Sequence, residues 1–165
     1  MISIITPAFE ESENIPILYD RLIDVFNSIN KEFEWLIIDD HSNDNTYEVI
    51  LGIAKDDNRV RGFRLAKNYG AQTAFKAGLH LSTGNCAIIM AADLQDPPES
   101  IPIMIEKWKK GAQVVWGNRT ERLGESIINK FLSNLYHLLM RKIMRIQYSL
   151  SMGSDFFLLD RRVIE

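Results

Sequence analysis

The segment from residue 35 to residue 46 reads WLIIDDHSNDNT, and its two halves decide the fold. The apolar run Trp35 to Ile38 suits a buried strand, and the polar residues after it suit a turn that leads into a helix. The same succession of apolar run, turn and helical periodicity recurs along the chain. The other apolar runs are Ile2 to Thr6, Val60 to Leu65, Cys86 to Ala91 and Val114 to Gly117.

Apolar residues at helical spacing lie between some of these runs. One set consists of Ile15, Leu18, Leu22, Ile23, Val25 and Phe26, and a second of Ile101, Ile103, Met104, Ile105 and Trp108. Strands that alternate with helices predict an α/β fold with an open, mostly parallel sheet and helices on both faces. Ligands bind to such sheets beyond the carboxyl ends of the strands.

The residues that follow the expected strands are therefore the candidates for a binding site. They are Pro7 to Glu10, Asp39 and Asp40, Asn68, Asp93 to Asp96, and Asn118 with Arg119. The adjacent carboxylates of Asp39 and Asp40 repel each other unless a ligand or a partner offsets their charge. This favours a site that accepts hydrogen bonds from a base or a ribose. Helix capping alone would explain Asp44 or Asn45.

Composition limits the classes of protein. A chain of 165 residues with 46% hydrophobic residues suits one domain with a sizeable core. The net charge of −3 gives no basic footprint for nucleic acid. Cys86 is the only cysteine, which excludes a disulfide framework, and its apolar neighbours predict a buried strand residue.

The two ends of the sequence carry further expectations. No secretory signal precedes Ile2, and no apolar run reaches the ~20 residues of a membrane-spanning helix, so we expect a cytoplasmic chain. Residues 160–165 look like the start of a helix, so we expect the natural protein to continue beyond Glu165.

A long helical pattern runs from Glu125 to Arg145, with basic residues that interrupt its apolar face. A basic amphipathic helix of this kind can lie at a membrane interface. A helix that packs on the core and exposes its basic face would show the same pattern. Both interpretations stay open.

Four motifs occur in order along the chain. They are PAFEE at residues 7–11, IDDHSNDNT at 38–46, KNYGAQ at 67–72 and AADLQDPP at 91–98. Together they resemble inverting glycosyltransferase family 2, above all its polyprenyl-phosphate branch of dolichol-phosphate mannose synthases and bactoprenol glucosyl- and aminoarabinosyltransferases. The resemblance covers nearly the whole chain.

The resemblance implies a GT-A fold, which is a Rossmann-like nucleotide-sugar-binding fold, in a single domain over residues 1–165. Residues 1–118 would bind the nucleotide-sugar, and residues 119–165 would form the acceptor side with the amphipathic helix. The implied reaction is inverting transfer of a sugar from a UDP- or GDP-sugar to undecaprenyl or dolichyl phosphate. This reaction would belong to cell envelope biosynthesis, at the cytoplasmic surface of the membrane.

On the nucleotide side, the resemblance assigns roles to seven residues. Asp39 would read the base edge beside Asp40, and the others would line the pocket or lie in the loop that closes on the nucleotide: Pro7, Ala8, Glu10, Asn68 and Gly70. The alternative for Gly70, and for Gly78, is helix initiation with close packing. We favour that alternative for Gly78.

The fourth strand ends where the family usually places an Asp-x-Asp motif. There a Mg²⁺ or Mn²⁺ ion offsets the charge of the donor diphosphate. This chain has Ala91 at the first motif position, Asp93 at the second, and Gln95 at a position that can also face the metal. The resemblance therefore implies a metal site at Asp93 and Gln95, with Asp93 also at the nucleotide. The missing carboxylate predicts a weaker hold on the ion.

On the acceptor side, the resemblance implies three catalytic residues. Arg119 and Arg122 would bind the donor diphosphate or the lipid phosphate, since guanidinium groups match phosphate oxygens; the alternative is ordinary surface arginines. Asp155, within MGSDFFLLDRR at 152–162, would be a catalytic base or would orient the acceptor. A phosphate acceptor is already ionised, so positioning matters more than proton removal.

Two other functions compete with this interpretation. One is a nucleotide-binding module that has lost catalysis, which Ala91 supports. The other is a transferase of the same family with a carbohydrate acceptor. The three histidines are scattered and show no spacing typical of metal ligands.

Overall fold

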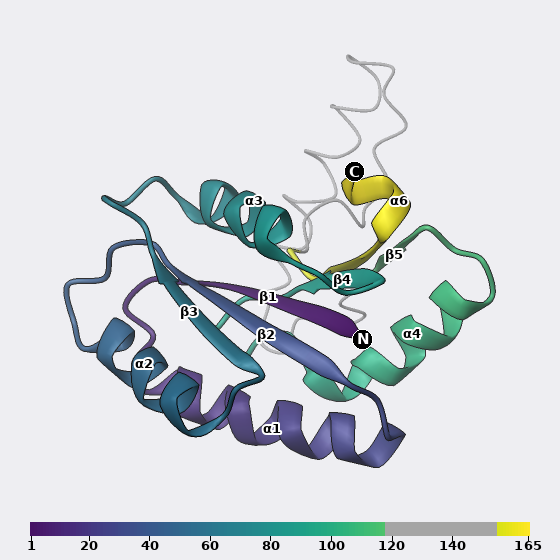
Figure 1. Ribbon diagram of the computed structural model, residues 1–165, viewed down its shortest axis with the longest axis horizontal. Coiled ribbons are helices and arrows are strands. Elements are labelled where there is room, and N and C mark those ends of the chain that lie inside the picture. Colours follow the sequence, from purple (N-terminus) through teal and green to yellow (C-terminus); the bar gives the residue numbers. More distant parts are fainter. Residues whose placement is uncertain (118–154) are drawn as a thin grey trace, which may run out of the picture. The chain divides into compact units, whose positions relative to one another are not determined.

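A six-stranded sheet in the order β3-β2-β1-β4-β6-β5 organises the part of the chain that the structure, a computed structural model, describes: residues 1–117 and 155–165 (Figure 1). Its strands are β1 (Ile2–Ala8), β2 (Phe33–Asp39), β3 (Val60–Arg64), β4 (Cys86–Ile89), β5 (Val114–Trp116) and β6 (Phe157–Asp160). The helices are α1 (Asn14–Ile29), α2 (Thr46–Asp56), α3 (Ala71–Leu81), the 3₁₀ turn η1 (Pro98–Ser100), α4 (Ile101–Lys109) and α6 (Arg161–Ile164).

The first four strands form the parallel part of the sheet. β1 pairs in parallel with β2 and with β4, and β2 pairs in parallel with β3. All seven residues of β2 are buried, as expected for a strand that is covered on both faces. The predicted apolar runs all form strands, and the predicted α/β class is confirmed.

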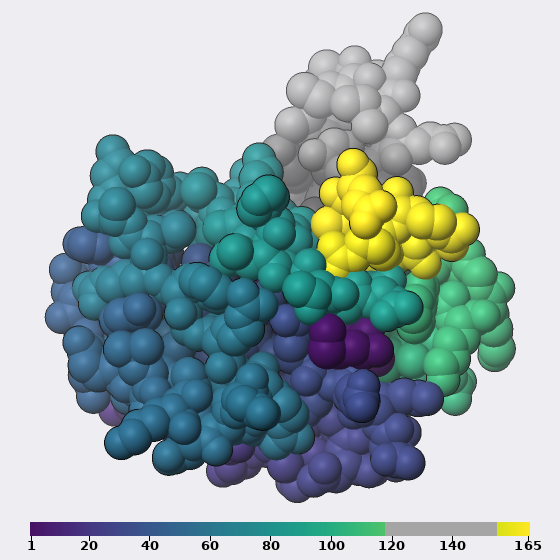
Figure 2. Space-filling model, in the orientation of Figure 1, coloured from purple at the N-terminus to yellow at the C-terminus, as the bar shows by residue number. Residues whose placement is uncertain are grey.

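β6 joins this sheet in the opposite direction. Its residues pair antiparallel with β4, from Cys86 opposite Asp160 to Ile89 opposite Phe157, and β5 pairs with its other side. Figure 2 shows the yellow C-terminal residues packed against the teal and green residues of the preceding segments. The sequence predicts an apolar strand here, but not its insertion between β4 and β5.

The larger core lies between the sheet and α1, α2 and α4, which cover one face (Figure 1). The apolar stripe of α1 is buried there as its periodicity predicts, with Ile15, Leu18, Leu22, Val25 and Phe26. Each such side chain contributes roughly 1.5–3 kcal/mol when it leaves water. Within the two described ranges, no helix has both the length and the apolar character to cross a membrane.

α3 covers the opposite face, over β1 and β2. Gly78 makes this close approach feasible, because a Cβ atom there would lie 2.3 Å from Cγ2 of Ile5. The close-packing interpretation of Gly78 is therefore confirmed. Cys86 is buried in the larger core, on the side of α1, α2 and α4. Burial raises the pKa of its thiol to about 12, so the predicted buried strand residue is confirmed as well.

Candidate functional site

The carboxyl ends of β1 and β2, with the segments that follow β1 to β4, lie at one edge of the sheet, termed the carboxyl edge from here on: residues 7–10, 39–46, 65–70 and 91–96. Backbone hydrogen bonds tie these segments together. Asp40 N–H donates to the Ala8 carbonyl at 2.8 Å, and Leu65 N–H donates to the Asp39 carbonyl at 2.9 Å. These two bonds join residues of the first two motifs directly and hold Leu65, which leads into the third motif, beside them.

The first of these segments has an unusual backbone. Glu10 adopts φ +58°, a left-handed conformation that side-chain-bearing residues seldom adopt. Its N–H donates to Ser42 Oγ at 2.9 Å, and its carboxylate accepts Asn43 Nδ2 at 3.1 Å. Ala8 is buried and Pro7 is partly exposed. These contacts fix the segment after β1 against the turn after β2.

Asp39 lies at the end of β2 and is fully buried, with 0% of its surface exposed. Its Oδ1 accepts the backbone N–H of Ser42 at 3.0 Å and also the Ser42 hydroxyl. Arg64 Nε lies 3.2 Å from Oδ2, an ion-pair distance without the alignment of a hydrogen bond. In this form Asp39 presents no accessible atom to a base.

Asp40 is also buried, at 3% exposure, and its partners are backbone groups. Oδ1 accepts the N–H of Tyr69 at 2.8 Å, and Oδ2 accepts the N–H of Gly70 at 2.7 Å. Both carboxylates of the Asp39–Asp40 pair therefore have partners inside the protein. Internal contacts thus offset the repulsion between the two carboxylates without a ligand.

The segment that leads into α3 is exposed around the two N–H groups that Asp40 binds. Gly70 adopts φ +87° at the N-cap of α3, which favours glycine, and Asn68 Oδ1 accepts its N–H at 3.2 Å. The side chain of Tyr69 is 51% exposed, and Lys67 Nζ lies 5.0 Å from its ring centroid. Helix initiation thus accounts for the conformation of Gly70.

The turn after β2 has one further structural carboxylate. Asp44 Oδ1 accepts the N–H of Thr46 at 3.1 Å and its hydroxyl at 2.6 Å. Burial raises the pKa of Asp44, but hydrogen bonds from Thr46 and Ser12 outweigh it, and the pKa lies below its usual value. Asp44 therefore takes the capping role at the start of α2, while the side chain of Asn45 makes no capping bond.

The segment after β4 carries the candidate metal ligands. Asp93 is partly exposed and Gln95 is exposed, and Asp93 Oδ1 accepts the N–H of Gln95 at 3.1 Å. Leu94 between them adopts φ +59°. The Pro-Pro turn that follows this strand in the sequence predicts that Asp96 is exposed; this prediction is wrong, because Asp96 is buried at 1% exposure. Asp93 and Gln95 thus lie together on a tight turn at the carboxyl edge.

On the acceptor side, the structure describes Asp155 alone among the predicted catalytic residues. Asp155 is exposed and precedes Phe156, which is buried, and β6. Because Phe157 pairs with Ile89 and Trp116 at the ends of β4 and β5, Asp155 belongs to the carboxyl edge. Arg119, Arg122 and the predicted helix from Glu125 to Arg145 lie outside the described residues.

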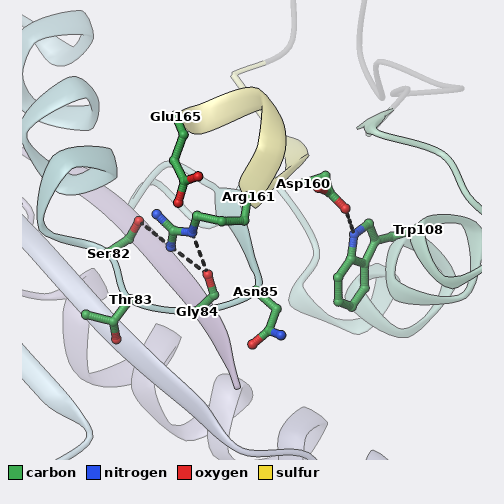
Figure 3. Close-up of a pocket in the computed structure, with 8 residues that line it drawn as sticks. All are labelled: Ser82, Thr83, Gly84, Asn85, Trp108, Asp160, Arg161 and Glu165. Atoms are coloured by element: carbon green, nitrogen blue, oxygen red, sulfur yellow. Dashed lines mark hydrogen bonds between the residues drawn. The ribbon is translucent and has the colours of Figure 1, made fainter.

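An open hollow of about 600 Å³ lies at the other end of the sheet (Figure 3). Arg161 spans it, and its guanidinium donates to the Gly84 carbonyl at 2.6 and 2.9 Å and to Ser82 Oγ at 3.1 Å. Trp108 Nε1 donates to Asp160 Oδ2 at 2.7 Å. These polar groups bind one another: Arg161 holds α6 to the connection between α3 and β4, and Trp108 holds α4 to β6. Structural contacts thus account for the polar lining of this hollow.

The sequence profile of glycosyl transferase family 2 matches residues 3–164, which is nearly the whole chain. The chain belongs to this family. Its resemblance to the family, deduced from four motifs, is thereby confirmed.

Relatives within the family are similar over almost all of this chain. The sequence is 36% identical over 163 residues to the uncharacterized glycosyltransferase YkcC of Bacillus subtilis, with 99% of this chain and 50% of YkcC covered. It is 35% identical over 164 residues to the prophage bactoprenol glucosyl transferase homolog of Escherichia coli K12, with 99% and 53% covered. The chain thus spans about half the length of these relatives.

The fold also matches solved structures. One is glucosyl-3-phosphoglycerate synthase of Mycobacterium tuberculosis in complex with Mn²⁺, UDP-glucose and phosphoglyceric acid. The TM-score is 0.72 at 18% sequence identity, with 99% of this chain and 57% of that chain covered. This likeness confirms the GT-A fold of the family 2 chain.

The residues on the turn after β4 fit a divalent cation whose remaining ligands are water and phosphate oxygens. Carboxylate and amide oxygens suit Mg²⁺ or Mn²⁺, and Mg²⁺ usually takes only one or two protein carboxylates beside water and phosphate oxygens. Asp93 keeps Oδ2 for such a role, with the Gln95 amide two residues away. Within residues 1–117 and 155–165, no three His, Cys, Asp or Glu side chains are grouped to hold an ion by themselves.

Three sets of contacts at this site were not predicted from the sequence. Ser42 stands three residues after Asp39, a local spacing that could have indicated their hydrogen bond. The pairing of Asp39 with Arg64, and of Asp40 with the backbone at Tyr69 and Gly70, joins separate motifs. No local pattern announces such pairings.

Proposed function

We propose that this chain is the catalytic domain of a glycosyltransferase that moves a sugar from a UDP- or GDP-sugar to a polyprenyl phosphate. The observation that carries the proposal is family 2 membership together with 35% identity to a relative named as a bactoprenol glucosyl transferase homolog. Bactoprenol is a polyprenyl lipid, and a phosphorylated form of it would be the acceptor. The reaction would take place at the cytoplasmic surface of the membrane.

In the proposed reaction, an oxygen of the lipid phosphate attacks the anomeric carbon of the sugar. The bond from that carbon to the donor diphosphate breaks, the nucleoside diphosphate leaves with the bonding electrons, and the configuration at the carbon inverts. The acceptor oxygen is already ionised near neutral pH, so no strong base is required. The protein then contributes mainly position and charge stabilisation.

The carboxyl edge would provide the donor site. Pro7, Ala8 and Glu10 would line the nucleotide pocket, and the loop with Asn68 and Gly70 would border it. Asp39 and Asp40 would belong to the same pocket, and because both are buried they would shape it through their partners.

Charge on the donor diphosphate would be met by a cation and by arginines. Asp93 and Gln95 would hold Mg²⁺ or Mn²⁺, which supplies Lewis-acid stabilisation of the leaving diphosphate when bound. Arg119 and Arg122 would bind the diphosphate or the lipid phosphate. Asp155 would orient the acceptor or accept a proton from it, since it is exposed two residues before β6 begins.

A second candidate function is supported by one residue. Ala91 stands where the family usually has a carboxylate, so a nucleotide-binding module without catalysis is the competing proposal. The two proposals differ in turnover but not in nucleotide binding.

A transfer assay separates them. The protein in its natural length is incubated with UDP- and GDP-sugars, undecaprenyl phosphate and Mn²⁺, and formation of a lipid-linked sugar is measured by mass spectrometry. We expect product with at least one donor, and its loss in Asp93→Ala. Nucleotide binding without any product would favour the module that has lost catalysis.

A further inference from the structure

One long segment, from Arg61 to Ala92, contains no aspartate or glutamate, although the chain has 22 acidic residues. It includes most of β3, the loop before α3, and all of α3 and β4. Its basic side chains are all exposed: Arg61, Arg64, Lys67, Lys76 and His80. Arg61 and Arg64 pair with the buried carboxylates of Glu34 and Asp39. The two lysines have no carboxylate partner among the described residues, so this segment is locally positive in a chain with a net charge of −3.

The fold places this segment on one side of the sheet, the side that α3 covers, termed the α3 face. Lys76 and His80 are exposed on α3, which has no acidic residue. On the opposite side, α1 and α2 expose the carboxylates of Asp20, Asp24, Glu48 and Asp56 (Figure 1). The exposed carboxylates of the C-terminal segment, Asp155 and Glu165, lie before β6 and after α6. The α3 face is therefore the side of the sheet that suits an anionic partner.

The α3 face also carries a row of aromatic side chains that ends at the edge of the sheet. Phe75 of α3 meets Phe157 of β6 edge to face, with 6.2 Å between ring centroids, and Phe157 lies 4.9 Å from Trp116 of β5. Trp116 and Val114 pair with Phe157 and Leu159 across the two strands, so these four side chains share one side of the sheet. Val114 and Trp116 are 39% and 41% exposed. The row thus ends in an exposed indole ring at the carboxyl end of β5.

A second exposed ring lies in the loop before α3. Tyr69 is half exposed, and the ammonium group of Lys67 lies 5.0 Å from its ring centroid. Tyrosine and tryptophan rings are enriched at the level of lipid headgroups, and lysines near a membrane are attracted to anionic lipids. Tyr69 and Trp116 both stand at the carboxyl edge, so lipid headgroups that meet these rings would be close to the proposed site of transfer.

We propose that the α3 face and the loop before α3 dock on an anionic lipid surface through Lys67, Tyr69, Lys76, Val114 and Trp116. The choice of partner rests on the function proposed above, because an enzyme whose acceptor is a lipid phosphate works where lipid headgroups are. Docking through these residues brings the carboxyl edge to the membrane surface. The acidic face of α1 and α2 then points to the solvent.

Trp116→Phe tests whether this surface meets the lipid. The protein of natural length is reconstituted with vesicles of phosphatidylcholine and phosphatidylglycerol that carry brominated acyl chains, and quenching of its tryptophan fluorescence is measured. Trp35 is fully buried and Trp108 belongs to α4 on the opposite side, so Trp116 is the described tryptophan that is placed to be quenched. We expect Trp116→Phe to remove a part of the quenching. Equal quenching in both proteins would overturn the proposal.

Lys76→Glu and its control Lys107→Glu test the charge of the surface. Both replace an exposed helical lysine and change the net charge equally, but Lys107 lies on α4. The equilibrium constant for docking follows from the quenching of Trp116 at increasing phosphatidylglycerol content. We expect Lys76→Glu to lower it about fivefold or more, and Lys107→Glu to leave it within about twofold. Circular dichroism checks that both variants are folded.

Equal losses in the two lysine variants would show that net charge alone attracts the protein, and would overturn the proposal. So would quenching of Trp116 that does not depend on phosphatidylglycerol. Binding of a soluble polyanion to the lysines, without quenching of Trp116 by lipid, would assign the surface to a nucleic acid or an acidic protein instead. Sugar transfer is measured on the same preparations. Product without quenching of Trp116 would refute the docking surface and leave the proposed function standing, whereas quenching without product would do the reverse.

Discussion

Both ends of β2 carry buried carboxylates with partners inside the protein, but the residues around the two ends differ. At the amino end, Glu34 Oε1 accepts the Ser3 hydroxyl at 2.6 Å as well as the N–H and hydroxyl of Thr83, and Oε2 pairs with Arg61 at 3.3 Å. At the carboxyl end, Asp39 and Asp40 are also buried, at 0% and 3% exposure, and their carboxylates also have partners inside the protein. The partners of Glu34 belong to strands and to the α3–β4 connection, which supports an architectural role.

The carboxyl end differs in what stands around the buried pair. Glu10, Asn43, Asn68 and Gln95 are exposed there, and Asp93 is partly exposed. These side chains offer oxygens and amides to a ligand, whereas the buried carboxylates hold the loops that carry them. A buried carboxylate thus marks where loops are fixed, and function depends on the exposed groups beside it.

The largest expected effect is on stability at the amino end. Glu34→Ala leaves the Thr83 N–H and the Ser3 hydroxyl without their acceptor, which should cost about 3 kcal/mol. Urea denaturation monitored by circular dichroism measures this loss. Affinity for UDP with Mn²⁺ should stay the same at temperatures where the variant is folded, and a large loss of affinity would break the comparison.

At the carboxyl edge, the effect should fall on turnover. Asp155→Asn should lower turnover about 100-fold or more if Asp155 acts at the acceptor, while donor affinity changes little. Single-turnover transfer to a polyprenyl phosphate and the melting temperature are measured together. Near-normal turnover in a folded variant would reduce Asp155 to a local structural residue.

The pH dependence of stability tests a further carboxylate, Asp57, which lies at the same edge of the sheet as Glu34. Hydrogen bonds from Arg59, and a further one from Tyr19, lower the pKa of Asp57 to about 2 although burial opposes them. Since the folded pKa lies below the unfolded value, this contribution is complete above about pH 4 and is lost as pH falls toward 2. Its size is about 1–2 kcal/mol, given the exposure of Arg59.

Asp57→Asn should remove this part of the pH dependence. The measurement is the free energy of unfolding of both proteins between pH 5 and pH 2, which are the limits set by the pKa values above. An identical slope in the two proteins would show that Asp57 is not responsible.

The smallest effect is expected from restoring the missing motif carboxylate. Ala91→Asp should tighten Mn²⁺ binding in the presence of UDP by up to about tenfold, because it adds a charged oxygen ligand near Asp93. The melting temperature should hardly change. Calorimetry on both proteins checks this, and an unchanged affinity for Mn²⁺ would show that residue 91 does not face the ion.

Much of the fold could be predicted because local patterns determine it. The apolar runs of β1 to β5 and the stripe on α1 are visible in the sequence, and they are present as expected. The insertion of β6 could not be predicted, since its pairing with Cys86 to Ile89 joins segments about 70 residues apart and depends on tertiary contacts.

The candidate site was predictable as a set of positions, because parallel strands bring the residues after them to one edge. The functions within the set were not. Nothing local shows that Arg64 neutralises Asp39 or that Asp40 holds the backbone at Gly70. The position of Asp96 between its strand and a Pro-Pro turn predicts an exposed side chain, yet Asp96 is buried, and no local pattern shows this.

The most direct test of the central claim is to map where a nucleotide binds. Amide chemical shifts of the protein are recorded by NMR during titration with UDP or GDP and Mg²⁺. We predict shifts at Ala8, Glu10, Asn43, Asn68 and Asp93, which share the carboxyl edge. Shifts confined to the hollow at Ser82 to Asn85 and Arg161, or no shifts with either nucleotide, would contradict the account.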